Sequence, residues 1–99
     1  MKFMAVWSID QDKWPLILQT WNGMTPEQIA NPGEGVKLIG RWHDLTARTG
    51  VVILESDSAL AVHRALNQWN PHLDIEVNPV LDDEECTEAI KLILADQAG

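Results

Sequence analysis

The order of its segments predicts that this chain adopts an α+β fold of the ferredoxin-like type. Strand-like and helix-like segments follow one another as βαββαβ, and a further helical segment ends the chain. A length of 99 residues with 45% hydrophobic residues suits a single domain around one core. We expect residues 1–99 to form a four-stranded antiparallel sheet with two helices on one face, with strands at 2–9, 36–43, 51–56 and 73–81 and helices at 13–22, 58–69 and 83–96.

The spacing of apolar residues changes between the first strand and the first helix, and this change predicts both elements. Over residues 2–9, apolar side chains fall on both faces, which is typical of a strand covered on both sides. Because Pro15 is tolerated only in the first helical turn, we expect Asp12 as the N-cap, with Gly23 just beyond the last turn. The helix then carries one apolar stripe formed by Trp14, Ile17, Leu18 and Trp21.

The middle of the chain supplies a capped turn, two strands and the second helix. Thr25 and Gln28 have the spacing of a capping box, which predicts one helical turn in the loop before the second strand. A short connection joins the second and third strands, and Asp57 then precedes the second helix as its N-cap. The apolar stripe of this helix consists of Val62, Ala65, Leu66 and Trp69.

The last strand alternates strictly, so one of its faces is polar. Leu73, Ile75 and Val77 point to one side, with polar residues between them. Asp82 or Asp83 caps the final helix, and the acidic run that they begin matches the positive end of the helix dipole. The apolar side of this helix is formed by Cys86, Ala89, Ile90, Ile93 and Leu94.

One face of the sheet needs a cover that the predicted helices do not supply. In a ferredoxin-like domain both helices lie on the same face, yet the strands at 2–9 and 51–56 are apolar on both sides. A second copy of the chain, the C-terminal helix or a ligand could cover the other face. We expect a homodimer that stacks two sheets, with the C-terminal helix as the alternative cover.

Composition excludes several classes of partner. Acidic residues outnumber basic ones by 15 to 7, for a net charge of −8, so we expect no nucleic-acid partner and no docking on anionic membranes. The sequence has no apolar run long enough for a membrane span and no signal peptide, and its single cysteine, Cys86, suits a reducing compartment, so we expect a cytoplasmic protein.

Metal and cofactor sites are not expected. His43, His63 and His72 lie on separate predicted elements and lack the spacing of a zinc site. Consecutive acids at the start of the last helix point in different directions and do not converge on a cation.

Several blocks of the sequence resemble a known family. The blocks are residues 2–7, 35–43, 54–57 and 73–83, and the most specific is Gly40-Arg41-Trp42-His43. They resemble the bacterial domain of unknown function 3303, which in turn is similar to the dimeric α+β-barrel superfamily. That resemblance implies a ferredoxin-like protomer that dimerises through its sheet. The superfamily includes monooxygenases, haem-degrading enzymes, isomerases and ligand-sensing domains, and it has no universal catalytic residue.

The haem-degrading members imply one specific comparison. They carry an iron-ligating histidine on the helix that corresponds to that of His63, together with an asparagine on the first strand. Here the first strand offers Trp7 and Ser8 instead, so we expect His63 to be a surface residue rather than a haem ligand.

The strongest candidate site residues lie at the end of the second strand. Alternation places Arg41 and His43 on one face and Trp42 on the other. Arg41 would hold a polar group, Trp42 would supply an aromatic wall and His43 would transfer protons. The structural alternative is an ion pair between Arg41 and Glu55 with Trp42 packed in the core or the dimer interface.

Glu55 and the tryptophans complete the candidate site. Glu55 follows four apolar residues, and a buried carboxyl group with a raised pKa would suit proton transfer. The helical tryptophans either fill the core or line a cavity that opens near the strand ends. We expect Trp7, Trp42 and Trp69 to line the site.

Two function classes follow. The first is a protein that binds a small apolar or aromatic molecule, which includes a cofactor-independent enzyme with His43 or Glu55 as its acid or base. The alternative is a non-catalytic homodimeric interaction or regulatory domain.

Overall fold

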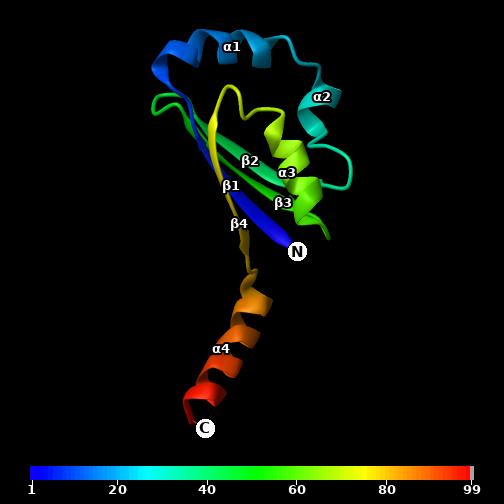
Figure 1. Cartoon of the computed structure of the whole chain (residues 1–99), viewed down its shortest axis with the longest axis vertical. Coiled ribbons are helices and arrows are strands. Elements are labelled where there is room, and N and C mark those ends of the chain that lie inside the picture. The colour runs from blue at the N-terminus through cyan, green and yellow to red at the C-terminus, as the bar shows by residue number, and fades with distance from the viewer. Residues whose placement is uncertain (99) are drawn as a thin grey trace.

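The computed structural model describes residues 1–98, and its strands form one antiparallel sheet (Figure 1). The strands lie in the order β2-β3-β1-β4, and every neighbouring pair is antiparallel. This is the predicted ferredoxin-like α+β fold. The strands are β1 (Lys2–Ser8), β2 (Lys37–Asp44), β3 (Thr49–Glu55) and β4 (Asp74–Val80), and the helices are the 3-10 turn η1 (Gln11–Lys13), α1 (Trp14–Asn22), α2 (Pro26–Ala30), α3 (Ala59–Asn67) and α4 (Asp83–Ala98).

The ends of these elements differ from the predicted ends by up to two residues, and two of the predicted caps are wrong. Asp12 lies inside η1, and α1 begins after Lys13 with no side-chain cap. The N-cap of α3 is Ser58 rather than Asp57, because the Ser58 hydroxyl accepts a hydrogen bond from the backbone N–H of Ala61 at 3.1 Å. This helix ends at Asn67, so Trp69 lies in the turn that follows it.

The predicted capping box is present at the start of α2. The Thr25 hydroxyl accepts from the backbone N–H of Gln28 at 3.2 Å, and the Gln28 side chain accepts from the backbone N–H of Thr25 at 2.8 Å. These two bonds hold the short helix in place although none of its residues is buried.

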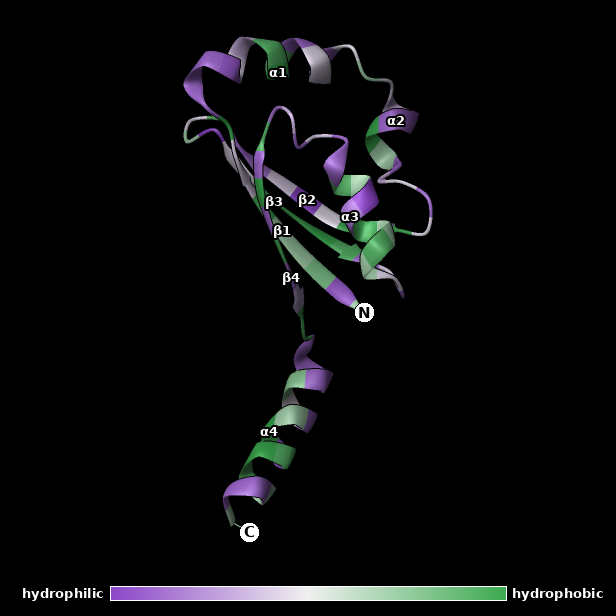
Figure 2. Ribbon diagram, viewed as in Figure 1, coloured by the Kyte–Doolittle hydropathy of each residue, from purple (hydrophilic) through white to green (hydrophobic). Residues whose placement is uncertain are grey.

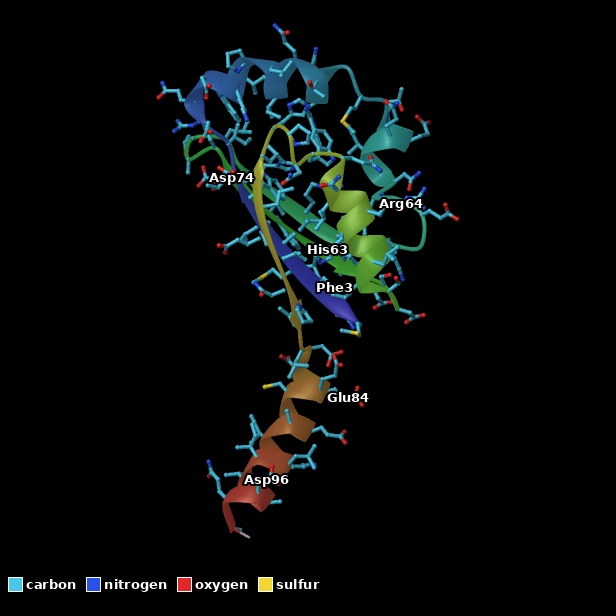
Figure 3. All side chains as sticks on the ribbon, in the orientation of Figure 1. Phe3, His63, Arg64, Asp74, Glu84 and Asp96 are labelled. Atoms are coloured by element: carbon cyan, nitrogen blue, oxygen red, sulfur yellow. The ribbon has the colours of Figure 1, made fainter. Side chains whose placement is uncertain are left out.

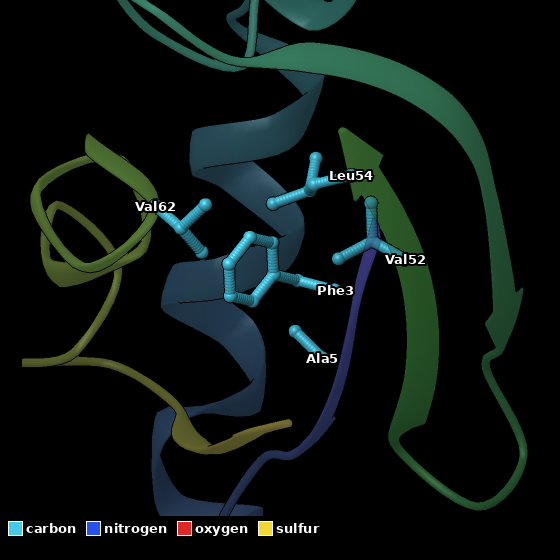
Figure 4. Close-up of a cluster of buried hydrophobic side chains, with 5 residues drawn as sticks. All are labelled: Phe3, Ala5, Val52, Leu54 and Val62. Carbon is cyan, nitrogen blue, oxygen red and sulfur yellow. The ribbon is translucent and has the colours of Figure 1, made fainter. Parts of the chain in front are cut away.

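The core lies between the sheet and α3 (Figure 4). Alternate residues of the two central strands point toward α3 and are buried there against Val62, which is fully enclosed. We call this side of the sheet the inner face. The buried side chains from the strands are Phe3, Ala5, Val52 and Leu54.

The predicted fold places both helices side by side on one face of the sheet, but α1 does not lie beside α3 on the inner face. It crosses the end of the sheet (Figure 1) and buries only Ile17, while Leu16 and Leu18 remain 48% and 44% exposed. Since α1 stands away from the strands, a space remains between them.

The opposite side of the sheet, the outer face, is not covered by any helix of the described chain. Helix α4 continues beyond the end of β4 and away from the sheet (Figures 1 and 2), and none of its residues is buried. The C-terminal helix therefore does not cover its own sheet. Met4 and Val6 of β1 are 36% and 38% exposed on the outer face. No helix within residues 1–98 is long and apolar enough to cross a membrane.

Candidate functional site

The space between α1 and the sheet is a cavity of about 810 Å³. Its walls come from the inner face, from α1 and α2, and from the end of α3 with the turn beyond it. Most lining side chains are apolar, and four of the five tryptophans are among them. The residues that carry the chemistry are Trp7, Trp14, Trp21, Trp69, Arg41 and His43.

Arg41 and His43 line the cavity from strand β2. Its pairing with β3 places Arg41 opposite Val52 and His43 opposite Gly50, both on the inner face. Trp42 lies between them and points to the outer face, where the tip of its ring lies over Gly40. The alternation predicted from the sequence is therefore confirmed.

Trp7 reaches the cavity because the residue beside it is a glycine. Trp7 of β1 is opposite Gly50 of β3, and its indole lies over the glycine so closely that a Cβ atom there would collide with the ring. On the other side of Gly50 is His43, whose ring meets Trp7 edge to face at a centroid distance of 5.6 Å.

Trp21 of α1 links the sheet residues to the far wall of the cavity. Its ring lies 4.9 Å from that of His43 at an interplanar angle of 67°. The Arg41 guanidinium carbon lies 5.4 Å from the Trp21 ring centroid, within the range of a cation–π contact. Trp69 follows at 6.5 Å from Trp21. Trp7, His43, Trp21 and Trp69 thus form one aromatic cluster, and Arg41 lies against its Trp21 ring.

The electrostatics of the site favour one cation and a neutral imidazole. Burial, together with the positive charge of Arg41, lowers the pKa of His43 from its usual value. Burial also lowers the pKa of Arg41, but a guanidinium remains protonated in proteins. The Arg41 Nη1 atom donates to the backbone oxygen of Ile29 at 3.1 Å, which ties β2 to α2.

Asp44 is the carboxylate at the cavity, and it accepts hydrogen bonds from the turn after β2. Its Oδ1 accepts from the backbone N–H groups of Thr46 and Ala47 at 3.1 and 3.0 Å, and from the Thr46 hydroxyl at 2.7 Å. These hydrogen bonds lower the pKa of Asp44. Asp44 therefore stabilises the turn rather than pairing with Arg41.

Two predicted site residues lie elsewhere. Trp42 is 61% exposed on the outer face, beside a shallow groove that also includes Val6 and Val51. Glu55 lies at the far end of β3, where its carboxylate meets the Lys2 ammonium at 3.5 Å. Because β2 and β3 are antiparallel, the end of one strand meets the start of the other, so Glu55 is far from Arg41 in register. The structural alternative, an ion pair between Glu55 and Arg41, is wrong for the same reason.

Trp14 and Trp21 also line the cavity, although they are not among the site residues predicted from the sequence. Both belong to the apolar stripe of α1, and helical spacing alone does not separate a cavity wall from a packed core. His63 is an exposed residue of α3 (Figure 3) and does not line the cavity. Within residues 1–98, no three His, Cys, Asp or Glu side chains are grouped in a way that could hold a metal ion.

Fold and cavity together define a small ferredoxin-like α+β domain with an aromatic pocket at one end of its sheet. The chain belongs to the family described as domain of unknown function DUF3303, whose sequence profile matches residues 1–93. This confirms the resemblance seen in the sequence.

Other comparisons add one similar fold. No curated protein matches the chain. A crystal structure from Deinococcus radiodurans, described as a "putative antibiotic biosynthesis monooxygenase", is similar at 14% sequence identity and a TM-score of 0.45. The similar region covers 83% of this chain and 94% of that one.

Proposed function

We propose that the protein binds a small apolar or aromatic molecule in the cavity between α1 and the sheet. The observation that carries the proposal is a space of about 810 Å³ lined by four tryptophans and by Arg41, whose guanidinium lies against the Trp21 ring. Small-molecule sites typically enclose about 300–1,000 Å³ and combine apolar walls with a few polar groups.

The tryptophans offer surface that a ligand would remove from water. Trp7, Trp14, Trp21 and Trp69 are all partly buried, so part of each indole still contacts solvent. Each Å² of apolar surface removed from water contributes about 25 cal/mol, and aromatic pairs add about 0.5–1.5 kcal/mol more. A flat apolar ligand between α1 and the inner face would therefore be bound by the hydrophobic effect.

His43 is the group at the cavity that suits proton transfer. A lowered pKa keeps its imidazole neutral at pH 7, which is the form that acts as a general base. Glu55, the other acid–base candidate, lies at the opposite end of the sheet and does not line the cavity. If the ligand is also a substrate, His43 would be the residue that moves its protons.

The test compares two tryptophans on opposite faces. The affinity of an aromatic probe such as 2-naphthoate is measured by calorimetry in the Trp21→Leu and Trp42→Leu variants. We expect Trp21→Leu to weaken binding about tenfold, because it removes a wall of the cavity, and Trp42→Leu to leave it unchanged. Equal losses in both variants, or no binding of naphthalene derivatives to the wild type, would contradict the proposal.

We also propose that two copies of the chain stack through their outer faces. The observation that favours this is the apolar centre of the outer face, which no helix of residues 1–98 covers. Cross-strand register assembles this centre from Met4, Val6, Val51, Ile53 and Trp42.

The charges at the two ends of the outer face argue for a second copy as the partner. One end carries Lys2, whose ammonium meets the carboxylates of Glu55 and Asp82, and Lys37, which makes no ion pair in the described structure. The other end, near α1, carries Asp74 and Glu76 of β4 (Figure 3 labels Asp74). A two-fold axis perpendicular to the strands would set the end with the unpaired Lys37 of one copy on the acidic end of the other.

Sedimentation velocity in the micromolar range tests the dimer. We expect Val6→Glu to yield monomers, since a carboxylate in the apolar centre would be buried without a partner. Leu60→Glu is the matched control, because Leu60 is 77% exposed on α3, away from the outer face. Lys37→Glu should weaken the dimer, because it places a carboxylate opposite the acidic end of the partner. A wild-type monomer throughout this range would overturn the dimer without affecting the cavity.

A further inference from the structure

Arg41 is a cation that faces the cavity without a carboxylate partner. Residues 1–98 contain ion pairs at Lys2 and at Arg64, but no acidic side chain lies within ion-pair distance of Arg41. Acidic residues outnumber basic ones by 15 to 7, so carboxylates are plentiful in this chain. The missing partner at Arg41 is therefore a feature of the site rather than of the composition.

The guanidinium is held in place with most of its donors free. One bond, from Nη1 to the Ile29 oxygen, fixes one edge, and the Trp21 ring at 5.4 Å lies against the group. A guanidinium carries five N–H donors in a planar fork that matches a carboxylate with two parallel bonds. The remaining N–H groups of Arg41 have no protein acceptor in the described structure.

No other charged group at the cavity competes for this role. The cavity lining contains three titratable side chains, Arg41, His43 and Asp44. Burial and the charge of Arg41 disfavour protonation of His43, and Asp44 accepts three hydrogen bonds within the turn after β2. The cavity thus presents one available cation beside aromatic walls.

Resting on the proposed function, we propose that the ligand is an aromatic carboxylate, with its ring against Trp21 and Trp69 and its carboxylate on the free edge of Arg41. Both rings are within reach of one ligand, since their centroids lie 6.5 Å apart. A neutral molecule would leave the partly buried guanidinium donors unpaired, and an ammonium ion would be repelled. A single guanidinium matches the single charge of a carboxylate.

The test uses three probes that share one ring system: 2-naphthoate, 2-naphthamide and 2-naphthylmethylammonium. Their dissociation constants are measured by calorimetry on the full chain at pH 7.5 and low salt. We expect 2-naphthoate to bind at least about tenfold more tightly than the amide, because only the carboxylate carries a negative charge and two oxygens that accept parallel bonds from Arg41. The ammonium probe should bind more weakly than the amide.

Two variants assign the preference to Arg41. In Arg41→Gln the carboxylate and the amide should bind about equally. Arg64→Gln removes the same charge from an exposed position on α3 and should keep the tenfold preference. If Arg41→Gln does not fold, Arg41→Lys replaces it and should retain a reduced preference for the carboxylate, since Lys keeps the charge but loses the fork.

The outcomes separate this inference from the proposed function. Equal binding of naphthoate and naphthamide to the wild type would overturn the carboxylate inference and leave the aromatic pocket standing. A preference that survives in Arg41→Gln would overturn the role of Arg41. If none of the three probes binds, both proposals fail.

Discussion

Trp7 and Trp42 are in similar positions on opposite faces of the same sheet. Each indole lies over a strand glycine, Trp7 over Gly50 and Trp42 over Gly40. Trp7 packs against the buried core and lines the cavity, whereas Trp42 is 61% exposed. The comparison teaches that a strand glycine admits an aromatic ring on either face, and that the cover of the face decides whether the ring becomes part of a site.

The largest expected difference between the two faces is in the cost of removing each ring. Trp7→Ala should lower the free energy of unfolding by about 2–4 kcal/mol, because it opens a gap beside the core. Trp42→Ala should cost less than about 1 kcal/mol, because most of its ring is already in water. Urea unfolding followed by circular dichroism measures both.

The dimer adds a condition to this comparison. If the loss of unfolding free energy in Trp42→Ala grows with protein concentration, we would attribute it to the proposed dimer, since partner binding stabilises the folded state by mass action. Equal, concentration-independent losses in both variants would contradict the contrast between the faces.

Substitution of the two glycines should show the same contrast between the faces, with smaller losses of unfolding free energy than the tryptophan variants. Gly50→Ala places a methyl group where the Trp7 ring lies, and this ring is confined by His43 and the core, so we expect a loss of about 1–3 kcal/mol. Gly40→Ala meets only the tip of the exposed Trp42 ring, which can swing away, so its effect should be within about 0.5 kcal/mol. The chemical shift of the Trp7 indole N–H should move in Gly50→Ala and stay unchanged in Gly40→Ala.

The sequence predicted the division between the faces but not the position of α1. Alternation along β2 was sufficient to place Arg41 and His43 opposite Trp42, because side chains of a strand alternate without exception in a regular ladder. The stripe on α1 identified which side of the helix meets the protein, but a stripe does not set the direction of the helix axis. Because α1 crosses the end of the sheet, Trp14 and Trp21 line a cavity where a packed core was equally consistent with the sequence.

The error at Glu55 has a different origin. Arg41 and Glu55 each lie near the end of a predicted strand, 36–43 and 51–56, and strand ends alone do not show which residues are neighbours. The antiparallel pairing of β2 with β3 sets Arg41 opposite Val52 and Glu55 opposite Lys37, so the register keeps their side chains apart. The position of α4 relative to the sheet could not be predicted from the sequence. Its apolar side chains do not pack on any element of the described chain.

The smallest expected effect is electrostatic and concerns His43, which lies between Trp7 and Trp21. Its pKa is lowered first by burial and second by the charge of Arg41. In Arg41→Gln the pKa of His43, followed by the Hε1 proton shift, should rise but stay below its ordinary value, since burial persists. Bound 2-naphthoate should raise it in the wild type, because a carboxylate offsets the guanidinium charge. Asp44, the other charged group at the cavity, keeps its hydrogen bonds in each case.

The sign of the stability effect follows from the same shift. A histidine with a lowered pKa in the folded state is protonated first in the unfolded state, so the unfolded chain binds more protons as pH falls below about 6.5. The contribution of His43 is therefore full above this pH and declines as pH drops toward the folded pKa. His43→Gln should remove that part of the pH dependence, measured as the difference in urea midpoint between pH 7.5 and pH 5.5. An unchanged difference would show that the aromatic ring contacts leave the imidazole as free to protonate as in the unfolded chain.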